Sequence, residues 1–317
     1  MTGSRVVALG HHQPAKVLTN HDLAAMVDTS DEWITSRVGI RTRHIGGPDE
    51  PVDELAARAA AKALAAAGLQ PADIDLVLVA TSTAIDRSPS MSARVAARLG
   101  MTAPAVMDIN VVCSGFTHAL ATADHTLRAG AATRALVIGA DKMGDIVDWT
   151  DRSSCVLMGD GAGAAVVVAD SGAHGGPPGI GPVLWGSVPG MGDAVRIEGT
   201  PPRFAQEGQS VYRWATTQLP PIARQVCEKA GIAPEDLAAV VLHQANLRII
   251  EPVARKIGAV NAVIARDVVD SGNTSAASIP MALSKLVERG EVATGDPVLL
   301  FGFGGNLSYA GQVIRCP

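Results

Sequence analysis

Two similar segments about 160 residues apart constrain the fold of this chain more than any other feature. Residues 66–81, AAGLQPADIDLVLVAT, match residues 229–244, KAGIAPEDLAAVVLHQ, and Gly68 pairs with Gly231 at an offset of 163 (231 − 68). A repeat this long indicates a duplicated domain and not a solenoid unit. Because each copy alternates strand-like and helix-like runs, it predicts an α/β fold of two halves with mainly parallel, helix-covered sheets.

The boundary between the halves is expected in the Gly/Pro-rich stretch 171–182, SGAHGGPPGIGP. We therefore divide the chain into residues 1–172 and 173–317. Residues 189–209 are interpreted as a surface or lid loop. The glycines of GDGAG at 159–163 are interpreted as a tight turn, because they lead into a β-rich run and not into the helix that a dinucleotide fingerprint requires.

Cys113 stands where a predicted strand meets a predicted helix. The apolar run at 106–112 indicates a short buried strand, and Phe116, Leu120 and Leu127 recur at helical spacing before Gly130 ends the helix. Free N–H groups of a first helical turn favour a thiolate, so this position predicts a lowered pKa and a nucleophilic role. A small buried core cysteine is the alternative, and position alone leaves both open.

A second elbow-like segment lies in the C-terminal half. Residues 111–117, VVCSGFT, match residues 268–274, VVDSGNT, at an offset of 157 (268 − 111), which places Asn273 opposite Phe116. Equivalent elbows would bring Cys113 and Asn273 toward one pseudo-twofold axis. Asn273 is alternatively an ordinary turn or cap residue.

Further polar and glycine residues follow predicted strands, where α/β sheets present functional groups. His243 ends the apolar run 240–242, with Asn246 and Arg248 soon after it. Gly304 and Gly305 follow the strand predicted at 298–301, and their N–H groups could face an anion. A structural histidine and turn glycines are the alternatives.

The polar segment 28–43, DTSDEWITSRVGIRTR, combines Trp33 with Arg37, Arg41 and Arg43. An indole face beside guanidinium groups suits a flat base that carries phosphates. The alternative is a helix with an inward tryptophan and solvated arginines.

Composition narrows the class of protein. The chain has 317 residues, 47% hydrophobic and 18% charged, and its net charge of −5 argues against a general nucleic-acid binder. Its four cysteines form no CxxC pair and no Cys/His cluster, so we expect reduced thiols and no metal. The N-terminus has no signal-peptide core and no run reaches the roughly 18 apolar residues of a membrane span, so no membrane association and a cytoplasmic location are expected.

Together these motifs resemble those of the β-ketoacyl-acyl-carrier-protein synthase III family of the thiolase superfamily. The resemblance covers essentially the whole chain and implies an α/β fold of five layers, α/β/α/β/α, built from two duplicated mixed-sheet halves. It also implies a homodimer that uses a coenzyme A thioester as substrate and needs no cofactor. The motifs are DTSDEWITSRVGIRTRH (28–44), DINVVCSGF (108–116), WTDRSS (149–154), GDGAGAAVV (159–167), HQANLRII (243–250), GNTSAAS (272–278) and FGFGGNLSYAG (301–311).

The resemblance also implies a reaction, the decarboxylative Claisen condensation of an acyl-CoA primer with malonyl-acyl carrier protein. The products are β-ketoacyl-acyl carrier protein and CO2, and the reaction starts fatty acid or polyketide synthesis. Cys113 would take the acyl group, His243 and Asn273 would bind the malonyl thioester carbonyl, and the N–H groups of Cys113 and Gly305 would form an oxyanion hole. The residues matched to the coenzyme A and phosphopantetheine tunnel are Trp33, Arg37, Arg152, Asn246 and Arg248.

Three positions of the acyl pocket depart from the family pattern. Val112 replaces a small residue, Tyr212 replaces a phenylalanine, and Ser88 stands where acetyl-specific members carry a bulky aromatic that crosses the dimer interface. A smaller wall predicts a primer larger than acetyl.

Alternative functions differ in the residues that they need. Relatives that transfer acyl groups to hydroxyl or amine acceptors often alter the histidine or asparagine, so His243 and Asn273 favour condensation. An inactive partner subunit would lack the nucleophile, which Cys113 argues against. Arg248, Arg255 and Lys256 form a candidate docking patch for an acidic carrier protein, with a solvated helix face as the alternative.

Overall fold

The computed structural model describes residues 3–170 and 179–317. The predicted boundary at 172/173 lies outside these residues. The N-terminal elements are β1 (Gly3–His12), β2 (Val17–Thr19), α1 (Asn20–Ala24), α2 (Asp31–Val38), β3 (Thr42–His44), α3 (Val52–Ala67), η1 (Pro71–Asp73), β4 (Leu76–Ala80), α4 (Met91–Arg98), β5 (Ala105–Ile109), η2 (Val112–Ser114), α5 (Gly115–Arg128), β6 (Arg134–Lys142), η3 (Met143–Asp145), α6 (Arg152–Cys155) and β7 (Asp160–Asp170), where η marks a 3₁₀ turn.

The C-terminal elements repeat this order in its main parts. They are β8 (Leu184–Gly186), η4 (Pro189–Ala194), β9 (Val195–Glu198), β10 (Arg203–Gln206), α7 (Gly208–Ala230), η5 (Pro234–Asp236), β11 (Ala239–Leu242), α8 (Leu247–Ile257), β12 (Val263–Ile264), α9 (Val268–Ser271), η6 (Ser275–Ala277), α10 (Ser278–Glu288), β13 (Pro297–Phe303), η7 (Gly305–Leu307) and β14 (Tyr309–Arg315). Among these described helices, none combines the length and the apolarity needed to cross a bilayer.

Two five-stranded sheets in the described residues have the same strand order. The first runs β1-β7-β6-β4-β5 and the second β8-β14-β13-β11-β12. In each, the last three strands are parallel, and the second strand, β7 or β14, is antiparallel to both of its neighbours. The first strand therefore runs in the same direction as the last three. The duplicated α/β fold and the mixed-sheet halves that the resemblance implied are therefore confirmed, whereas the repeat alone did not predict the one antiparallel strand in each sheet. The sheets are mixed because β7 and β14 return beside their predecessors without a crossover helix of the βαβ type.

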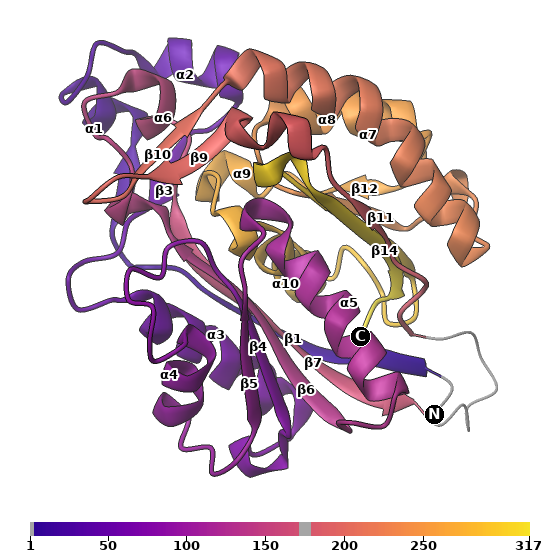
Figure 1. The fold of residues 1–317 in the computed structure, drawn as a ribbon. Helices are drawn as coiled ribbons and strands as arrows, with labels where there is room; N and C mark the ends of the chain where they lie inside the picture. The colour runs from indigo at the N-terminus through magenta and orange to yellow at the C-terminus, as the bar shows by residue number, and fades with distance from the viewer. Residues whose placement is uncertain (1–2, 171–178) are drawn as a thin grey trace.

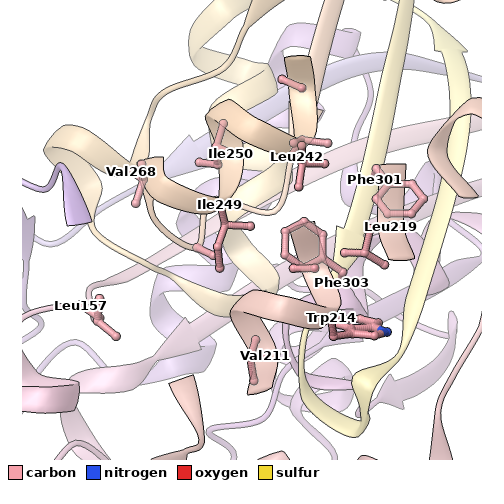
Figure 2. Packing of buried hydrophobic residues seen from close by; sticks show 14 of the residues in the cluster. Leu157, Val211, Trp214, Leu219, Leu242, Ile249, Ile250, Val268, Phe301 and Phe303 are labelled. Atoms are coloured by element: carbon pink, nitrogen blue, oxygen red, sulfur yellow. The ribbon is translucent and has the colours of Figure 1, made fainter. Parts of the chain in front are cut away.

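Helices and sheets alternate in five layers (Figure 1). Helices α3 and α4 cover the outer face of the first sheet, α5 and α10 lie between the sheets, and α7 and α8 cover the second sheet. Strand residues alternate between these layers. Leu76 and Leu78 face the central helices, whereas Val77 and Val79 face α3 and α4. Figure 2 shows the outer C-terminal core, where Trp214 and Leu219 of α7 pack near Phe301 and Phe303 of β13.

The repeat of residues 66–81 at residues 229–244 is visible in the backbone. Gly68 and Gly231 end α3 and α7 in the left-handed region, with φ of 66° and 68°, and each precedes a 3₁₀ turn and a central strand. A glycine at this C-cap avoids the Cβ clash of the left-handed conformation. The 163-residue offset therefore reflects a real equivalence of the two halves.

Two local predictions are wrong. Residues 189–209 are not a loop but contain η4 and the hairpin β9–β10. The glycines at 159–163 belong mostly to strand β7, and a Cβ on Gly163 would lie 2.6 Å from the backbone nitrogen of Met281. Glycine is needed there because β7 passes so close to the central helix α10.

Candidate active site

A cavity of about 740 Å3 joins the two halves near the start of α7. Buried Cys113, His243 and Asn273 line its inner part, and exposed residues such as Arg37 and Arg248 line its opening. Of the candidate residues from the sequence, those that line the cavity are Cys113, His243, Asn273, Gly305, Arg37, Asn246, Arg248 and Tyr212. The structure thus gathers into one cavity residues that are up to 268 positions apart (305 − 37).

Cys113 lies on the predicted elbow between strand β5 and helix α5. The 3₁₀ turn η2 makes the corner, with Val112 held at φ of 49°, a left-handed conformation that is rare for a β-branched residue. Cys113 is buried and Gly115 begins the helix. Because this backbone conformation is strained for valine, the surrounding fold must hold the corner in its geometry.

The equivalent elbow in the C-terminal half is not the one expected from the sequence. Ser275 has φ of 50° and begins η6, directly before α10, as Val112 begins η2 before α5. The offset is again 163 (275 − 112), six residues more than the expected 157. The matched segment VVDS is instead a separate short helix, α9, so the pairing of Asn273 with Phe116 is wrong. Asn273 still reaches the same cavity as Cys113.

His243 follows strand β11 directly, as predicted. Its backbone N–H donates to the carbonyl of Phe301 on β13, and its Nδ1 lies 2.8 Å from Oγ of Ser278 on α10. The ring packs edgewise on Phe303, with centroids 5.4 Å apart. Burial lowers the pKa of His243 to about 3, so the imidazole is neutral at physiological pH.

Asn273 is held by its backbone and its side chain. Its N–H donates to the carbonyl of Leu157, and its own carbonyl accepts from Gly159. Its Oδ1 accepts a hydrogen bond of 2.9 Å from the backbone N–H of Ser275. Because a backbone nitrogen only donates, this bond identifies the side-chain oxygen and leaves the Nδ2 amino group free to donate elsewhere.

Gly304 and Gly305 close over Cys113. A Cβ on Gly304 would lie 2.5 Å from Cβ and 2.9 Å from Sγ of Cys113, and a Cβ on Gly305 would meet Val112. The backbone N–H groups of Gly305 and Cys113 both act to lower the pKa of the thiol. Two donors therefore converge beside the sulfur atom.

The lowered pKa expected for Cys113 is wrong. Burial raises the pKa of the thiol to about 11, and the nearby carboxylate of Asp141 acts in the same direction, against the favourable side chain of Ser275 and the N–H groups of Gly305 and Cys113. Desolvation destabilises the thiolate of Cys113 by more free energy than the helix N-terminus stabilises it. In the free protein Cys113 is therefore a protonated thiol at neutral pH.

Trp33 and Arg152 form an aromatic–cation pair, and neither is among the residues that line the cavity. The guanidinium carbon of Arg152 on α6 lies 5.1 Å from the ring centroid of Trp33 on α2, and Arg152 also donates to the carbonyl of Asp28. Trp33 stands one helical turn before Arg37, which lines the cavity. Asn246 caps α8 by accepting from the N–H of Ile249.

Comparison with known proteins identifies the family. The chain is 81% identical to Beta-ketoacyl-[acyl-carrier-protein] synthase III 2 of Streptomyces avermitilis over 317 residues, all of both chains, and 79% identical to Beta-ketoacyl-[acyl-carrier-protein] synthase III 4 of Streptomyces coelicolor over 99% of both. The chain belongs to the β-ketoacyl-acyl-carrier-protein synthase III family. Two models of 3-oxoacyl-[acyl-carrier-protein] synthase III agree, matching residues 107–180 and, for its C-terminal part, 227–316.

Solved synthase III structures share the whole fold. The priming β-ketosynthase of the R1128 polyketide pathway superposes with a TM-score of 0.95 at 39% identity, covering 99% of this chain and 96% of that one. The 3-oxoacyl-[acyl-carrier-protein] synthase III of Aquifex aeolicus gives 0.93 at 38% identity, covering 99% and 100%. The five-layered thiolase fold that the resemblance implied is confirmed.

The candidates for the synthase acyl pocket do not lie together. Tyr212 lines the cavity and is 41% exposed. Val112 is not among the lining residues and faces Gly305. Ser88 is exposed in the segment between β4 and α4, outside the cavity.

Several residues that contact the site were not predicted from the sequence. Leu157, Phe204 and Phe303 supply apolar walls, and Ser278 contacts His243. The motif GNTSAAS carried Ser278, but 35 residues separate it from His243, and nothing in the sequence indicates that contact.

Proposed function

We propose that this chain condenses an acyl-CoA primer with malonyl-acyl carrier protein through an acyl-cysteine on Cys113. The observation that carries the proposal is the meeting of Cys113, a neutral His243 and an oriented Asn273 in one cavity. The reaction requires one site to bind two thioesters in turn. A cysteine nucleophile can take the acyl group of the first, and two neutral hydrogen-bond donors can bind the carbonyl of the second.

In the first step, the sulfur of Cys113 attacks the thioester carbonyl of acyl-CoA. The N–H groups of Cys113 and Gly305 are placed to stabilise the oxyanion, and losing one such donor typically costs about 3 kcal/mol of barrier. Coenzyme A leaves with the proton of the thiol, and the acyl group remains on Cys113.

In the second step, the malonyl thioester carbonyl accepts hydrogen bonds from His243 and Asn273. Loss of CO2 leaves an enolate, and these two donors stabilise its developing negative charge. The enolate carbon attacks the acyl-cysteine, a carbon–carbon bond forms, and the Cys113 thiolate leaves and takes up a proton. A histidine that stays neutral donates without first having to gain a proton.

The opening of the cavity suits the nucleotide end of coenzyme A. The Trp33–Arg152 pair offers two flat faces for adenine, and Arg37 and Arg248 offer charge for phosphates. Asn246 uses its Oδ1 as a helix cap, so its amino group is free for the pantetheine arm.

We also propose a homodimer built on the edge strand β5. Its backbone edge has no neighbouring strand among the described residues, and Met107 on β5 is 45% exposed. In such a dimer the exposed Ser88 would form part of a shared acyl pocket, and its small size supports a primer larger than acetyl. Equal or faster turnover with acetyl-CoA than with isobutyryl-CoA or butyryl-CoA would refute this preference.

The proposed reaction is tested by product analysis. Purified protein is incubated with a panel of acyl-CoAs and malonyl-acyl carrier protein, beside Cys113→Ala, and CO2 and β-ketoacyl carrier protein are measured. We expect equal amounts of the two products from the unmodified protein and no β-ketoacyl carrier protein from Cys113→Ala, which cannot hold the acyl group. Transfer of the acyl group to added alcohols or amines, with no CO2, would instead indicate an ester- or amide-forming acyltransferase.

A further inference from the structure

We propose that Ser278 is a positioning residue that fixes His243 in the tautomer protonated on Nε2. This inference rests on the proposed function, because the Nε2 proton is the one that a malonyl thioester would meet.

Ser278 is the first residue of α10 and is buried beneath His243. Its Oγ lies 2.8 Å from Nδ1 of His243 and 3.3 Å from the backbone nitrogen of Gln244. The N–H of Gln244 only donates, so it occupies a lone pair of the hydroxyl oxygen. One lone pair of the hydroxyl stays available, but Nδ1 is the only acceptor for the hydroxyl proton among residues 3–170 and 179–317. If Nδ1 donated instead, that buried proton would have no partner, so Nδ1 accepts it.

An accepting Nδ1 carries no proton of its own. A neutral imidazole has one N–H, and burial keeps His243 neutral by lowering its pKa to about 3. The proton therefore resides on Nε2, on the ring edge opposite Ser278. His243 lines the cavity, so this edge is the one available to a substrate carbonyl.

The same turn also orients the second donor. The backbone N–H of Ser275, three residues before Ser278, holds Oδ1 of Asn273 and leaves Nδ2 as the donor. Residues 275–278 thus set the direction of both hydrogen-bond donors. A protonated Nε2 also cannot accept the proton of Cys113, so His243 serves the second step and not the activation of the thiol.

The tautomer is measured first in the unmodified protein. Nitrogen-15 NMR of protein labelled on histidine, with His243→Gln used to assign the signal, shows which ring nitrogen carries the proton. We expect a protonated Nε2 and an unprotonated Nδ1 that do not change between about pH 5.5 and 8.5, because the pKa lies far below this range. A protonated Nδ1 or a titration within this range would overturn the proposal, whether or not any variant folds.

Variants then separate positioning from stability. In Ser278→Ala we expect both tautomers of His243 and a condensation step slowed about tenfold, the scale on which groups that orient a functional histidine act. Acylation of Cys113 by acyl-CoA should stay within about twofold, and Ser278→Thr, which keeps the hydroxyl, should restore the Nε2 tautomer. Ser284→Ala is the matched control, since Ser284 lies on the same helix, is buried and contacts Nδ1 of His11, away from the cavity.

Unchanged tautomer and unchanged condensation in Ser278→Ala would refute the positioning role. If the proposed function itself is wrong, the result is different, because no acyl-CoA then labels Cys113 of the unmodified protein. The NMR result does not depend on that outcome.

Discussion

Substituting Gly304 by alanine should disable Cys113 without altering any functional group. The new Cβ would lie 2.5 Å from Cβ and 2.9 Å from Sγ of Cys113. Non-bonded carbon atoms rest about 3.5–4.0 Å apart, so the two segments must separate by about 1 Å. Cys113 cannot swing freely, because it is buried on an elbow between β5 and α5.

A displacement of about 1 Å at a reacting atom costs on the order of 100-fold in rate. We therefore expect Gly304→Ala to form the acyl-cysteine about 100-fold more slowly and to lose about 1–3 kcal/mol of stability through overpacking. The rate is followed by intact-protein mass spectrometry after mixing with acyl-CoA, and the stability by urea denaturation.

Gly208→Ala is the matched control for this substitution. Gly208 lines the same cavity at the start of α7, but a Cβ there meets no atom within 4 Å. It should acylate at the unmodified rate. If Gly304→Ala acylates as fast as Gly208→Ala, the close approach of Gly304 to Cys113 is not a feature of the working enzyme.

Three further predictions concern the thiol and the cavity opening. Cys113 of the free protein has a pKa of about 11, so its thiolate fraction should rise with pH up to pH 10. We expect the rate of its alkylation by iodoacetamide to increase about tenfold per pH unit from pH 7 to 10. A plateau of this rate near pH 8 would contradict the raised pKa. Arg152→Ala should raise the KM for acyl-CoA about fivefold by removing a stacking face, with no effect on acyl-pantetheine thioesters, which lack the nucleotide. Arg248→Glu should raise the KM for malonyl-acyl carrier protein about tenfold by repelling an acidic carrier, whereas Lys229→Glu, an exposed change near the end of α7, should leave it unchanged.

The parts of the fold that depend on local backbone chemistry could be predicted from the sequence. Gly68 and Gly231 end helices by a mechanism that needs glycine, so their repeat was readable and its offset was correct. The second elbow was misplaced because VVDSG (268–272) is similar in sequence to VVCSG (111–115) but forms a separate short helix. The true equivalents are Val112 and Ser275, which share a left-handed φ. Neither valine nor serine favours this conformation, so the sequence does not predict it.

The parts of the site that depend on tertiary structure could not be predicted. The position of Cys113 at a helix start suggested a stabilised thiolate, but its burial and the carboxylate of Asp141 reverse the sign of the pKa shift. The contact between Ser278 and His243 joins α10 to the end of β11 across 35 residues. Such contacts arise only when the two elements pack.

The most direct test of the account is a single-turnover measurement on preformed acyl-Cys113. The unmodified protein and Asn273→Ala are first labelled with acyl-CoA and then mixed with malonyl-acyl carrier protein, and the adduct is followed by intact mass. We predict that both proteins are labelled at similar rates, and that Asn273→Ala clears its adduct at least about 100-fold more slowly, because it has lost a donor to the malonyl carbonyl. Equal clearance in the two proteins, or clearance without β-ketoacyl carrier protein, would contradict the assignment of this cavity to decarboxylative condensation.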